Sequence, residues 1–270
     1  MMGKAWMIAS GKGGAGKSTI AAALATALSQ QKERVCIIDV DIGLRDQDLI
    51  LGVENRIVYD LLDVLSGDCT LEEALVSPAP FHRLSLLPAA QFARSRDLDP
   101  KAFRQTLRTL KRKFDHVLIA CPAGIERGFR TVMANEYDSV ILICTPDDVC
   151  IRNAERTVSL LDEQKMPRPQ LIVNRLHANL IASGEMYAAQ TVAQTLDLPL
   201  LGEVPDDMAL YRALLTHKNP MQLDCEAQRA LSRIAQRMRG VSVPFPAYGT
   251  RKAGLFRKLL TRRVKEVRAD

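Results

Sequence analysis

The sequence predicts an α/β protein with a doubly wound, mostly parallel sheet. Short apolar runs alternate with longer amphipathic stretches, which is typical of repeated strand–helix–strand units. A glycine-rich loop follows the first apolar run and opens a helix-forming stretch, as in phosphate-binding α/β domains. With 270 residues, 47% of them hydrophobic and 25% charged, the chain is long enough to bury one large core.

The alternation predicts the order of the elements along the chain. Apolar runs predict strands over 5–9, 34–38, 84–87, 116–120, 139–145, 170–174 and 200–204. The stretches between them predict helices over 17–31, 59–65, 100–113, 124–135, 151–164, 184–195, 208–215 and 227–240. The run 241–249 contains two prolines and breaks the pattern, so it favours a linker. We predict a folded domain over 1–240, a linker over 241–253 and an amphipathic helix over 254–270.

The strongest functional signal is the glycine-rich loop after the first strand. Its glycines let backbone N–H groups turn toward phosphate oxygens, and the helix that follows adds donors and partial positive charge. We expect Lys17 to reach the β- and γ-phosphates and the Ser18 hydroxyl to bind Mg²⁺. The loop predicts a P-loop NTPase with ATP and Mg²⁺ as cofactors, rather than an ordinary strand-to-helix turn. The expected phosphate-binding residues are Gly11, Lys12, Gly13, Gly14, Ala15, Gly16, Lys17, Ser18 and Thr19.

Two acidic residues, Asp39 and Asp41, follow the second predicted strand. The carboxyl ends of parallel strands meet at one edge of the sheet, so both side chains are expected beside the phosphates. We expect Asp39 to join Ser18 in serving the metal and Asp41 to position the attacking water. The alternative is that both are loop acids that cap the next helix.

A second lysine, Lys12, directly follows the first glycine, where a plain phosphate loop needs none. The run 12–19 resembles the deviant Walker A box of the MinD/ParA family of ATPases. This resemblance implies that Lys12 reaches across a homodimer to the partner's phosphates, so that ATP binding is coupled to dimerisation. It adds Lys12 to Lys17 and Asp41 as catalytic residues. The alternative for Lys12 is a solvated loop lysine.

Further segments are similar to the MinD branch of this family, and the resemblance covers essentially the whole chain. It implies an ATPase hydrolase that is cytoplasmic and peripheral on the inner face of the cell membrane. The implied role is selection of the septum site in cell division, with a MinC-like inhibitor and a MinE-like or other activator as partners. The similar segments are 41–52, 58–60, 67–68, 87–90, 122–126 and 202–206.

One position departs from the family pattern. The family's Walker B strand ends in an aspartate two residues before the block 122–126, and this chain has Ala120 there. Such an acid holds a metal-bound water, and losing a supporting group of this kind typically costs about 10–100-fold in metal affinity or activity. We expect Mg·ATP to bind still but turnover to be weakened, with Asp39 supplying part of the missing charge.

The resemblance also implies residues that contact adenine and a partner protein. Relatives contact adenine at positions that here are Asn174, Arg175, Pro205 and Asp206, although Asn174 also suits a strand-end turn. The run 146–156 resembles the start of a partner-docking helix. There Asn153 replaces an expected acid and Glu155 keeps one. The alternative for this run is an acid-rich helix N-terminus.

The charge of the chain is concentrated in its C-terminal tail. The whole chain has 37 basic and 31 acidic residues, a net charge of +6. Residues 251–270 carry eight basic and two acidic side chains, so the other 250 residues are balanced. A balanced body makes nucleic-acid binding unlikely as a general property and favours a partner specific to the tail.

The tail has the pattern of an amphipathic membrane helix. Apolar residues form one stripe and basic residues flank it, which favours the interface of an anionic membrane. The alternative is a helix that folds back onto the body. The tail resembles the membrane-targeting helix of the MinD branch but is longer and more charged. The predicted membrane residues are Leu255, Phe256, Arg257, Lys258, Leu259 and Leu260.

Three other functions compete with the membrane ATPase. A hydrolysis-impaired, nucleotide-gated scaffold would follow from Ala120, and a ParA-type DNA-partitioning ATPase would share the loop. An iron–sulfur reductase component would need two cysteines per subunit at a dimer axis. Cys121 could be mistaken for one of them, but 84–100 supply no second, so this function is discounted. The six cysteines form no CxxC pair, and the four histidines have no metal spacing. We expect no signal peptide and no membrane-spanning helix.

Overall fold

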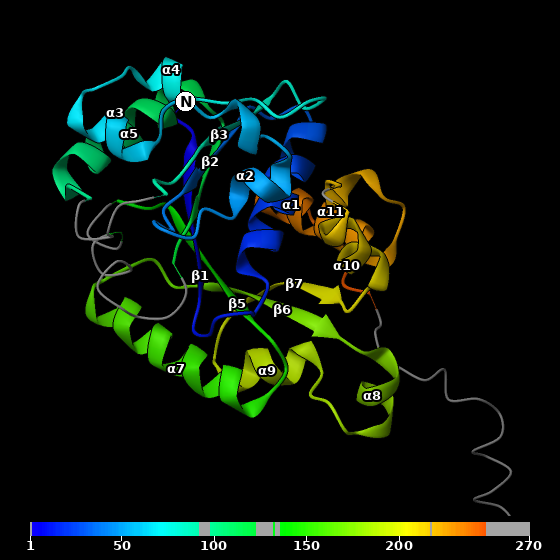
Figure 1. The fold of residues 1–270 in the computed structure, drawn as a ribbon. Helices are drawn as coiled ribbons and strands as arrows, with labels where there is room; N and C mark the ends of the chain where they lie inside the picture. Colours follow the sequence, from blue (N-terminus) through cyan, green and yellow to red (C-terminus); the bar gives the residue numbers. More distant parts are fainter. Residues whose placement is uncertain (1, 92–97, 123–131, 133–135, 217, 247–270) are drawn as a thin grey trace, which may run out of the picture.

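A seven-stranded sheet, in which every pair of neighbouring strands is parallel, forms the centre of the protein (Figure 1). The computed structural model describes residues 2–91, 98–122, 132, 136–216 and 218–246. The strand order is β3-β2-β4-β1-β5-β6-β7. The strands are β1 (Lys4–Ser10), β2 (Val35–Asp39), β3 (Leu84–Leu87), β4 (His116–Ala120), β5 (Ser139–Cys144), β6 (Gln170–Leu176) and β7 (Leu200–Pro205).

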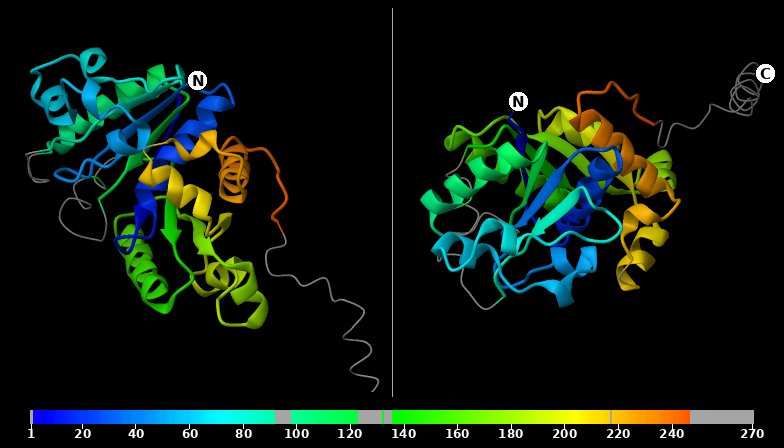
Figure 2. Two further views of the ribbon diagram at one scale, coloured as in Figure 1. Left: turned by 45° about the vertical axis from the view of Figure 1, so that its right-hand side comes forward. Right: turned by 90° about the horizontal axis from the view of Figure 1, so that it is seen from above.

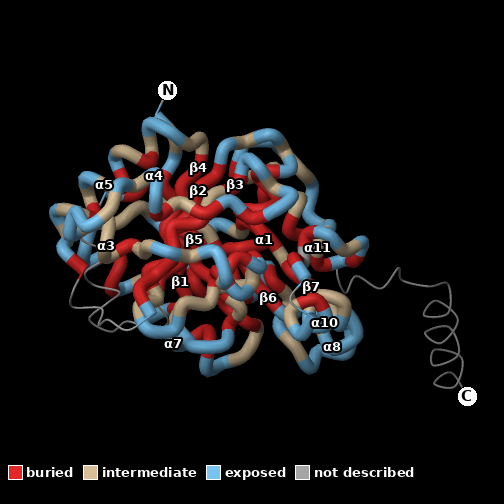
Figure 3. Tube along the Cα trace, turned by 45° about the horizontal axis from the view of Figure 1, so that its top comes forward, coloured by how far each residue is buried: buried red, intermediate tan, exposed pale blue. Residues whose placement is uncertain are grey.

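Helices cover both faces of the sheet (Figure 2). Helices α1 (Lys17–Gln30) and α11 (Glu226–Met238) pack together on one face, and α5 (Pro100–Lys113), α7 (Asp148–Glu163) and α9 (Ala189–Thr195) pack on the other. The strands are therefore buried on both sides, as Figure 3 shows in red. Burial on both faces explains why these strands read as nearly continuous apolar runs rather than as alternating ones.

Shorter helices lie in the connections. They are α2 (Gln47–Leu51), α3 (Leu61–Ser66), α4 (Leu71–Ala74), α8 (Ala178–Ser183) and α10 (Met208–Leu215), with 3-10 turns at Glu54–Arg56 and Pro220–Gln222. Helices α3 and α4 begin in capping boxes formed by Asp60 with Asp63 and by Thr70 with Glu73. These caps satisfy backbone donors that such short helices otherwise leave exposed.

The strand order places the candidate site. β1 lies between β4 and β5, and the chain builds the β2, β3, β4 side of the sheet before it crosses to the β5, β6, β7 side. The connections leave β1 and its neighbours in opposite directions, which opens a crevice at the carboxyl ends of the central strands. The glycine loop follows β1 at this crevice.

The predicted fold class and all seven strands are confirmed, with ends that differ by no more than two residues. Among the helices, the prediction over 184–195 is wrong. Gly184, with a φ of 84°, ends α8, and α9 begins only at Ala189. The prediction over 151–164 starts too late, because Asp147 caps α7 and lets it begin at Asp148. Helices α2, α4 and α8 were not predicted.

Some predictions fall on residues that the structure does not describe. The predicted helix over 124–135, the end of the linker and the amphipathic helix over 254–270 lie there, so these remain predictions. Residues 241–246, the described part of the predicted linker, contain no helix or strand. Across the described part of the chain, no helix is both long enough and apolar enough to cross a bilayer.

Candidate functional site

The phosphate loop depends on glycine at two places where a side chain would collide. Gly16 has a φ of 93°, and a Cβ there would lie 2.3 Å from Asn174 Nδ2. A Cβ on Gly11 would lie 2.5 Å from the carbonyl carbon of Asn153, because α7 crosses directly behind the loop. The loop is thus bent by Gly16 and pressed between α7 and the end of β6, with its backbone free to face a ligand.

The candidate phosphate site continues into α1 and the segment after β2. Lys17 is only 6% exposed, and its Nζ lies 3.8 Å from Asp41 Oδ2. The loop, Asp41 and Asp46 line a cavity of about 450 Å³, which Thr19 also lines. Burial raises the pKa of Asp41, and the nearby Lys17 opposes that rise. The fold therefore brings together two residues that are 24 positions apart in the chain.

Asp39 lies at the end of β2 and is 1% exposed. Its two carboxylate oxygens accept N–H bonds from Asp41 (2.9 Å) and Gln47 (3.2 Å). Burial raises its pKa to about 7, although these hydrogen bonds and Lys17 oppose the rise. Asp39 therefore orders the segment that carries Asp41. Its direct contacts here are to the backbone.

The surroundings of Ser18 fit a hydrated magnesium ion. Ser18 Oγ lies 3.4 Å from Asp46 Oδ2, and Gln47 Nε2 donates to the Ser18 carbonyl oxygen at 3.2 Å. Gln47 Oε1 is buried and has no hydrogen-bond partner among the described residues, an atom that a metal-bound water would satisfy. Sequence reasoning singled out neither Asp46 nor Gln47. These two residues could have been identified from the sequence as polar side chains in a loop that follows a strand at the carboxyl edge of the sheet.

Ala120 ends β4 next to this carboxylate cluster. It is 1% exposed and lies opposite Asp39 in the register of β2 and β4. The following residue, Cys121, is also buried, and burial raises the pKa of its thiol to about 12. The position therefore carries no ionised group at neutral pH, and Asp39 is the acid in the adjacent strand.

The four residues predicted to contact adenine line one cavity. This cavity of about 330 Å³ lies at the carboxyl ends of β6 and β7, and Met208 and Tyr211 of α10 complete it. Asn174 Nδ2 donates to the Ala15 carbonyl oxygen at 2.8 Å, which ties the cavity to the phosphate loop. The predicted adenine contacts that line this cavity are Asn174, Arg175, Pro205 and Asp206.

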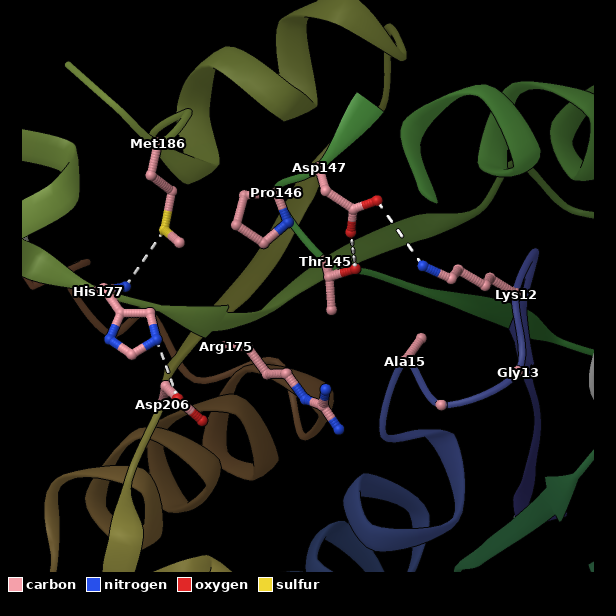
Figure 4. A pocket seen from close by; sticks show the side chains of 11 residues that line it. Lys12, Gly13, Ala15, Thr145, Pro146, Asp147, Arg175, His177, Met186 and Asp206 are labelled. Carbon is pink, nitrogen blue, oxygen red and sulfur yellow. Dashed lines mark hydrogen bonds and ion pairs between the residues drawn. The ribbon is translucent and has the colours of Figure 1, made fainter. Parts of the chain in front are cut away.

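Lys12 lines the cavity that holds Lys17 and also a second cavity next to it, which Figure 4 shows. Its side chain is 45% exposed, and its Nζ lies 3.9 Å from Oδ1 of Asp147, the cap of α7. The second cavity, about 470 Å³, is also lined by Arg175 and by His177, which pairs with Asp206 at 2.9 Å. The Lys12–Asp147 and His177–Asp206 pairs were not predicted from sequence, because each joins separate strand ends.

Comparison with known proteins gives the family. Residues 6–221 match the model of the CobQ/CobB/MinD/ParA nucleotide binding domain. The chain is 39% identical over 262 residues to the septum site-determining protein MinD of Bacillus subtilis, covering 96% of this chain and 97% of that protein. The chain belongs to the MinD/ParA family. The predicted P-loop ATPase class is thereby confirmed.

Solved structures place the chain with the MinD proteins of the family. A MinC:MinD cell division protein complex from Aquifex aeolicus contains a chain that is 34% identical, with a TM-score of 0.84 and coverage of 91% of this chain and 99% of that one. MinD of Pyrococcus horikoshii, solved with Mg-ADP, is 26% identical, with a TM-score of 0.78 and coverage of 88% and 96%. A ParA family ATPase from Chlorobium tepidum is 22% identical, with a TM-score of 0.73, and shares the fold alone. The MinD-like cell-division class is confirmed and the partitioning alternative is not favoured.

Proposed function

We propose that the chain is a membrane-switch ATPase that dimerises on ATP and recruits a division inhibitor to place the septum. The observation that carries this proposal is the cavity in which buried Lys17 lies beside Asp41 and the glycine loop, while Lys12, on the same cavity, is about half exposed. A site with one buried lysine and one exposed lysine suits a nucleotide that is contacted by both subunits of a dimer.

The enclosed residues support ATP hydrolysis. Lys17 and the loop N–H groups bind the β- and γ-phosphates, and Asp41 orients a water for attack on the γ-phosphorus. The bond from the γ-phosphorus to the bridging oxygen breaks, giving ADP and phosphate. Bound at Ser18, Mg²⁺ would neutralise charge on the phosphate oxygens. The Mg-ADP bound to the Pyrococcus horikoshii relative supports the same cofactors here.

The adenine is proposed to lie between the ends of β6 and β7. Asn174 supports this position because it lines the cavity and also hydrogen-bonds the phosphate loop. The sites proposed for the base and for the phosphates are therefore linked through one side chain. Arg175, Pro205 and Asp206 complete the proposed contacts. Tyr211 adds an aromatic surface against which a base can pack.

Ala120 supports weakened turnover rather than loss of binding. The phosphate contacts from Lys17, Ser18 and the loop do not involve it, whereas the acid that usually organises metal-bound water is missing. A hydrolysis-impaired scaffold is the second candidate, because Ala120 is buried beside Asp39 and the described residues that follow it, Cys121 and Pro122, carry no charge.

Dimerisation is proposed to run through Lys12. Its contact with Asp147 is long, at 3.9 Å, and both side chains are nearly half exposed, so the pair stabilises the chain little. Lys12 is therefore available to a phosphate of a second copy's nucleotide. Lys12, Lys17 and Asp41 together form the proposed catalytic set.

The partners and membrane contact are proposed from the relatives and the tail. The Aquifex aeolicus complex of MinC with MinD supports a MinC-like inhibitor, with α7 as its docking helix and exposed Glu155 as a contact. A MinE-like or other activator would speed hydrolysis. The tail, with Leu255, Phe256 and Leu260 on its apolar stripe and Arg257 and Lys258 beside it, would hold the protein peripherally on the inner membrane face.

Co-sedimentation with anionic vesicles in ATP and in ADP tests the proposal, with phosphate release followed in the same tubes. Sedimentation in ATP alone, with slow release that an activator speeds, supports the membrane-switch ATPase. Sedimentation in ATP without any release favours the scaffold. No ATP-dependent sedimentation contradicts the proposed membrane role.

A further inference from the structure

The segment that follows α11 is held against the body although it contains no helix or strand. Gly240, with a φ of 84°, reverses the backbone after the helix, and the N–H of Val241 donates to the Gln236 carbonyl oxygen at 3.0 Å. Residues 241–246, which we call the strap, continue from this turn as the orange segment beyond α11 (Figure 2). The turn sets the direction in which the strap leaves the helix.

One side chain, Arg237, makes the contacts that hold the strap. Its Nε donates to the Val243 carbonyl oxygen and its Nη2 to that of Pro244, both at 3.0 Å. The guanidinium carbon also lies 3.9 Å from the centroid of the Phe245 ring. From the same group, Nη1 donates at 3.0 Å to the carbonyl oxygen of Leu201 in β7. The planar guanidinium thus joins α11, β7 and the strap.

Apolar burial does not hold the strap. Val241 is 46% exposed and Phe245 45% exposed, so the strap removes little apolar surface from water. Arg237 is itself partly buried, and burial lowers its pKa, with Arg233 adding to that effect and Glu203 opposing it. A buried guanidinium needs acceptors, and the two strap carbonyls supply them. The strap and Arg237 therefore stabilise each other.

We propose that Arg237 is a positioning residue for the C-terminal tail. By holding the strap, it fixes the chain as far as Pro246, so that seven residues, 247–253, rather than the 13 residues 241–253 separate the last fixed residue from the helix predicted over 254–270. This inference rests on the proposed membrane role of that helix. The strap sets how far each tail of a dimer reaches from the body.

The spacer length has a calculable effect on membrane binding. The effective concentration of a tethered group falls roughly as the −3/2 power of the tether length, so a change from seven to 13 residues lowers it about 2.5-fold. Releasing the strap therefore weakens the second tail's contact in an ATP-bound dimer. Nucleotide binding is unaffected, because Arg237 lies on α11 and lines none of the nucleotide cavities.

The test compares full-length chains carrying Arg237→Ala and Arg229→Ala. Arg229 lies on the same helix, is exposed and pairs with Asp224, so it is the matched control. Proteinase K cleavage within 241–246, followed by mass spectrometry, is expected to be about tenfold faster in Arg237→Ala, because an opened segment is cut in proportion to its population. Binding in ATP to vesicles of phosphatidylcholine and phosphatidylglycerol is expected to weaken two- to threefold. Six Gly/Ser residues inserted after Gly249 should reproduce that loss without faster cleavage of the strap.

Each outcome decides one part of the proposal. Cleavage at the wild-type rate in Arg237→Ala overturns the strap. Faster cleavage with unchanged vesicle binding overturns the positioning role. If the unaltered chain does not bind vesicles in ATP, the membrane function fails, and the cleavage rates still decide whether Arg237 holds the strap. Arg237→Lys keeps the charge but loses the planar guanidinium with its several N–H donors, so an intermediate cleavage rate is expected. This variant replaces Arg237→Ala in the test if the alanine variant does not fold.

Discussion

Replacing Ala120 by aspartate is expected to raise magnesium-dependent ATP turnover and to destabilise the nucleotide-free chain. The new carboxylate would stand at the end of β4, opposite Asp39 in β2, at a position that is 1% exposed. There it could organise metal-bound water, and supporting groups of this kind are typically worth about 10–100-fold in activity. We expect a gain in turnover within that range.

The cost to the nucleotide-free chain follows from the same geometry. Adjacent strands lie about 4.8 Å apart, so two ionised carboxylates at that separation repel each other by about 3.5 kcal/mol at an effective dielectric constant of about 20. The folded-state pKa of Asp39 is already raised from 3.8 to about 7. Between these two values the folded chain binds more protons than the unfolded chain, so stability falls as the pH rises. The second acid extends this fall above pH 7.

The assay is phosphate release with saturating Mg·ATP, together with chemical denaturation of the nucleotide-free chain at pH 6 and pH 8. Ala120→Asn is the matched control, because it has nearly the same volume and no charge. It should show the loss from crowding at both pH values but no gain in turnover. Turnover of Ala120→Asp equal to that of the unaltered chain, with nucleotide binding intact, would refute the reasoning.

Three further predictions concern the loop, the base cavity and the core. Gly184→Ala should lower the free energy of unfolding by about 1 kcal/mol, because the glycine has a φ of 84°. Gly16→Ala should lower it more and should also weaken nucleotide binding at least about tenfold, because Asn174 must move. Equal losses of the two variants in chemical denaturation would contradict this. Asn174→Ala should weaken nucleotide binding roughly fivefold by calorimetry, about 1 kcal/mol for its bond to Ala15, and an unchanged affinity would argue against this link. Burial lowers the pKa of His116, which accepts a bond from Trp6 Nε1 at 3.0 Å. The unfolded chain then takes up the proton first, so the contribution of His116 to stability should decline as the pH falls below about 6.5, opposite in sign to that of Asp39. Unfolding is followed by the fluorescence of the single tryptophan. His116→Gln should remove that dependence, and a decline of the same size in this variant would contradict the assignment.

Local patterns were enough to predict the sheet and the phosphate loop. Each strand is a contiguous apolar run buried on both faces, so its position is written in a few neighbouring residues. The loop is a strand, a glycine run and a helix in direct succession, and its chemistry needs no distant residue to be recognised. The same locality explains the errors. The prediction over 184–195 followed the apolar pattern and passed over the helix-ending conformation of Gly184.

The pairings that make the site work were decided only by the tertiary structure. Lys17 with Asp41, Asn174 with Ala15 and Lys12 with Asp147 join elements that the sheet order brings to one edge. Their partners lie 24 to 159 positions apart, and no periodicity reports on such contacts. The sequence by itself determined which groups the chain has for phosphate chemistry, because these are properties of residue type and spacing. The fold determined which of them are buried, paired or exposed, because burial and distance arise only when the strands take their order.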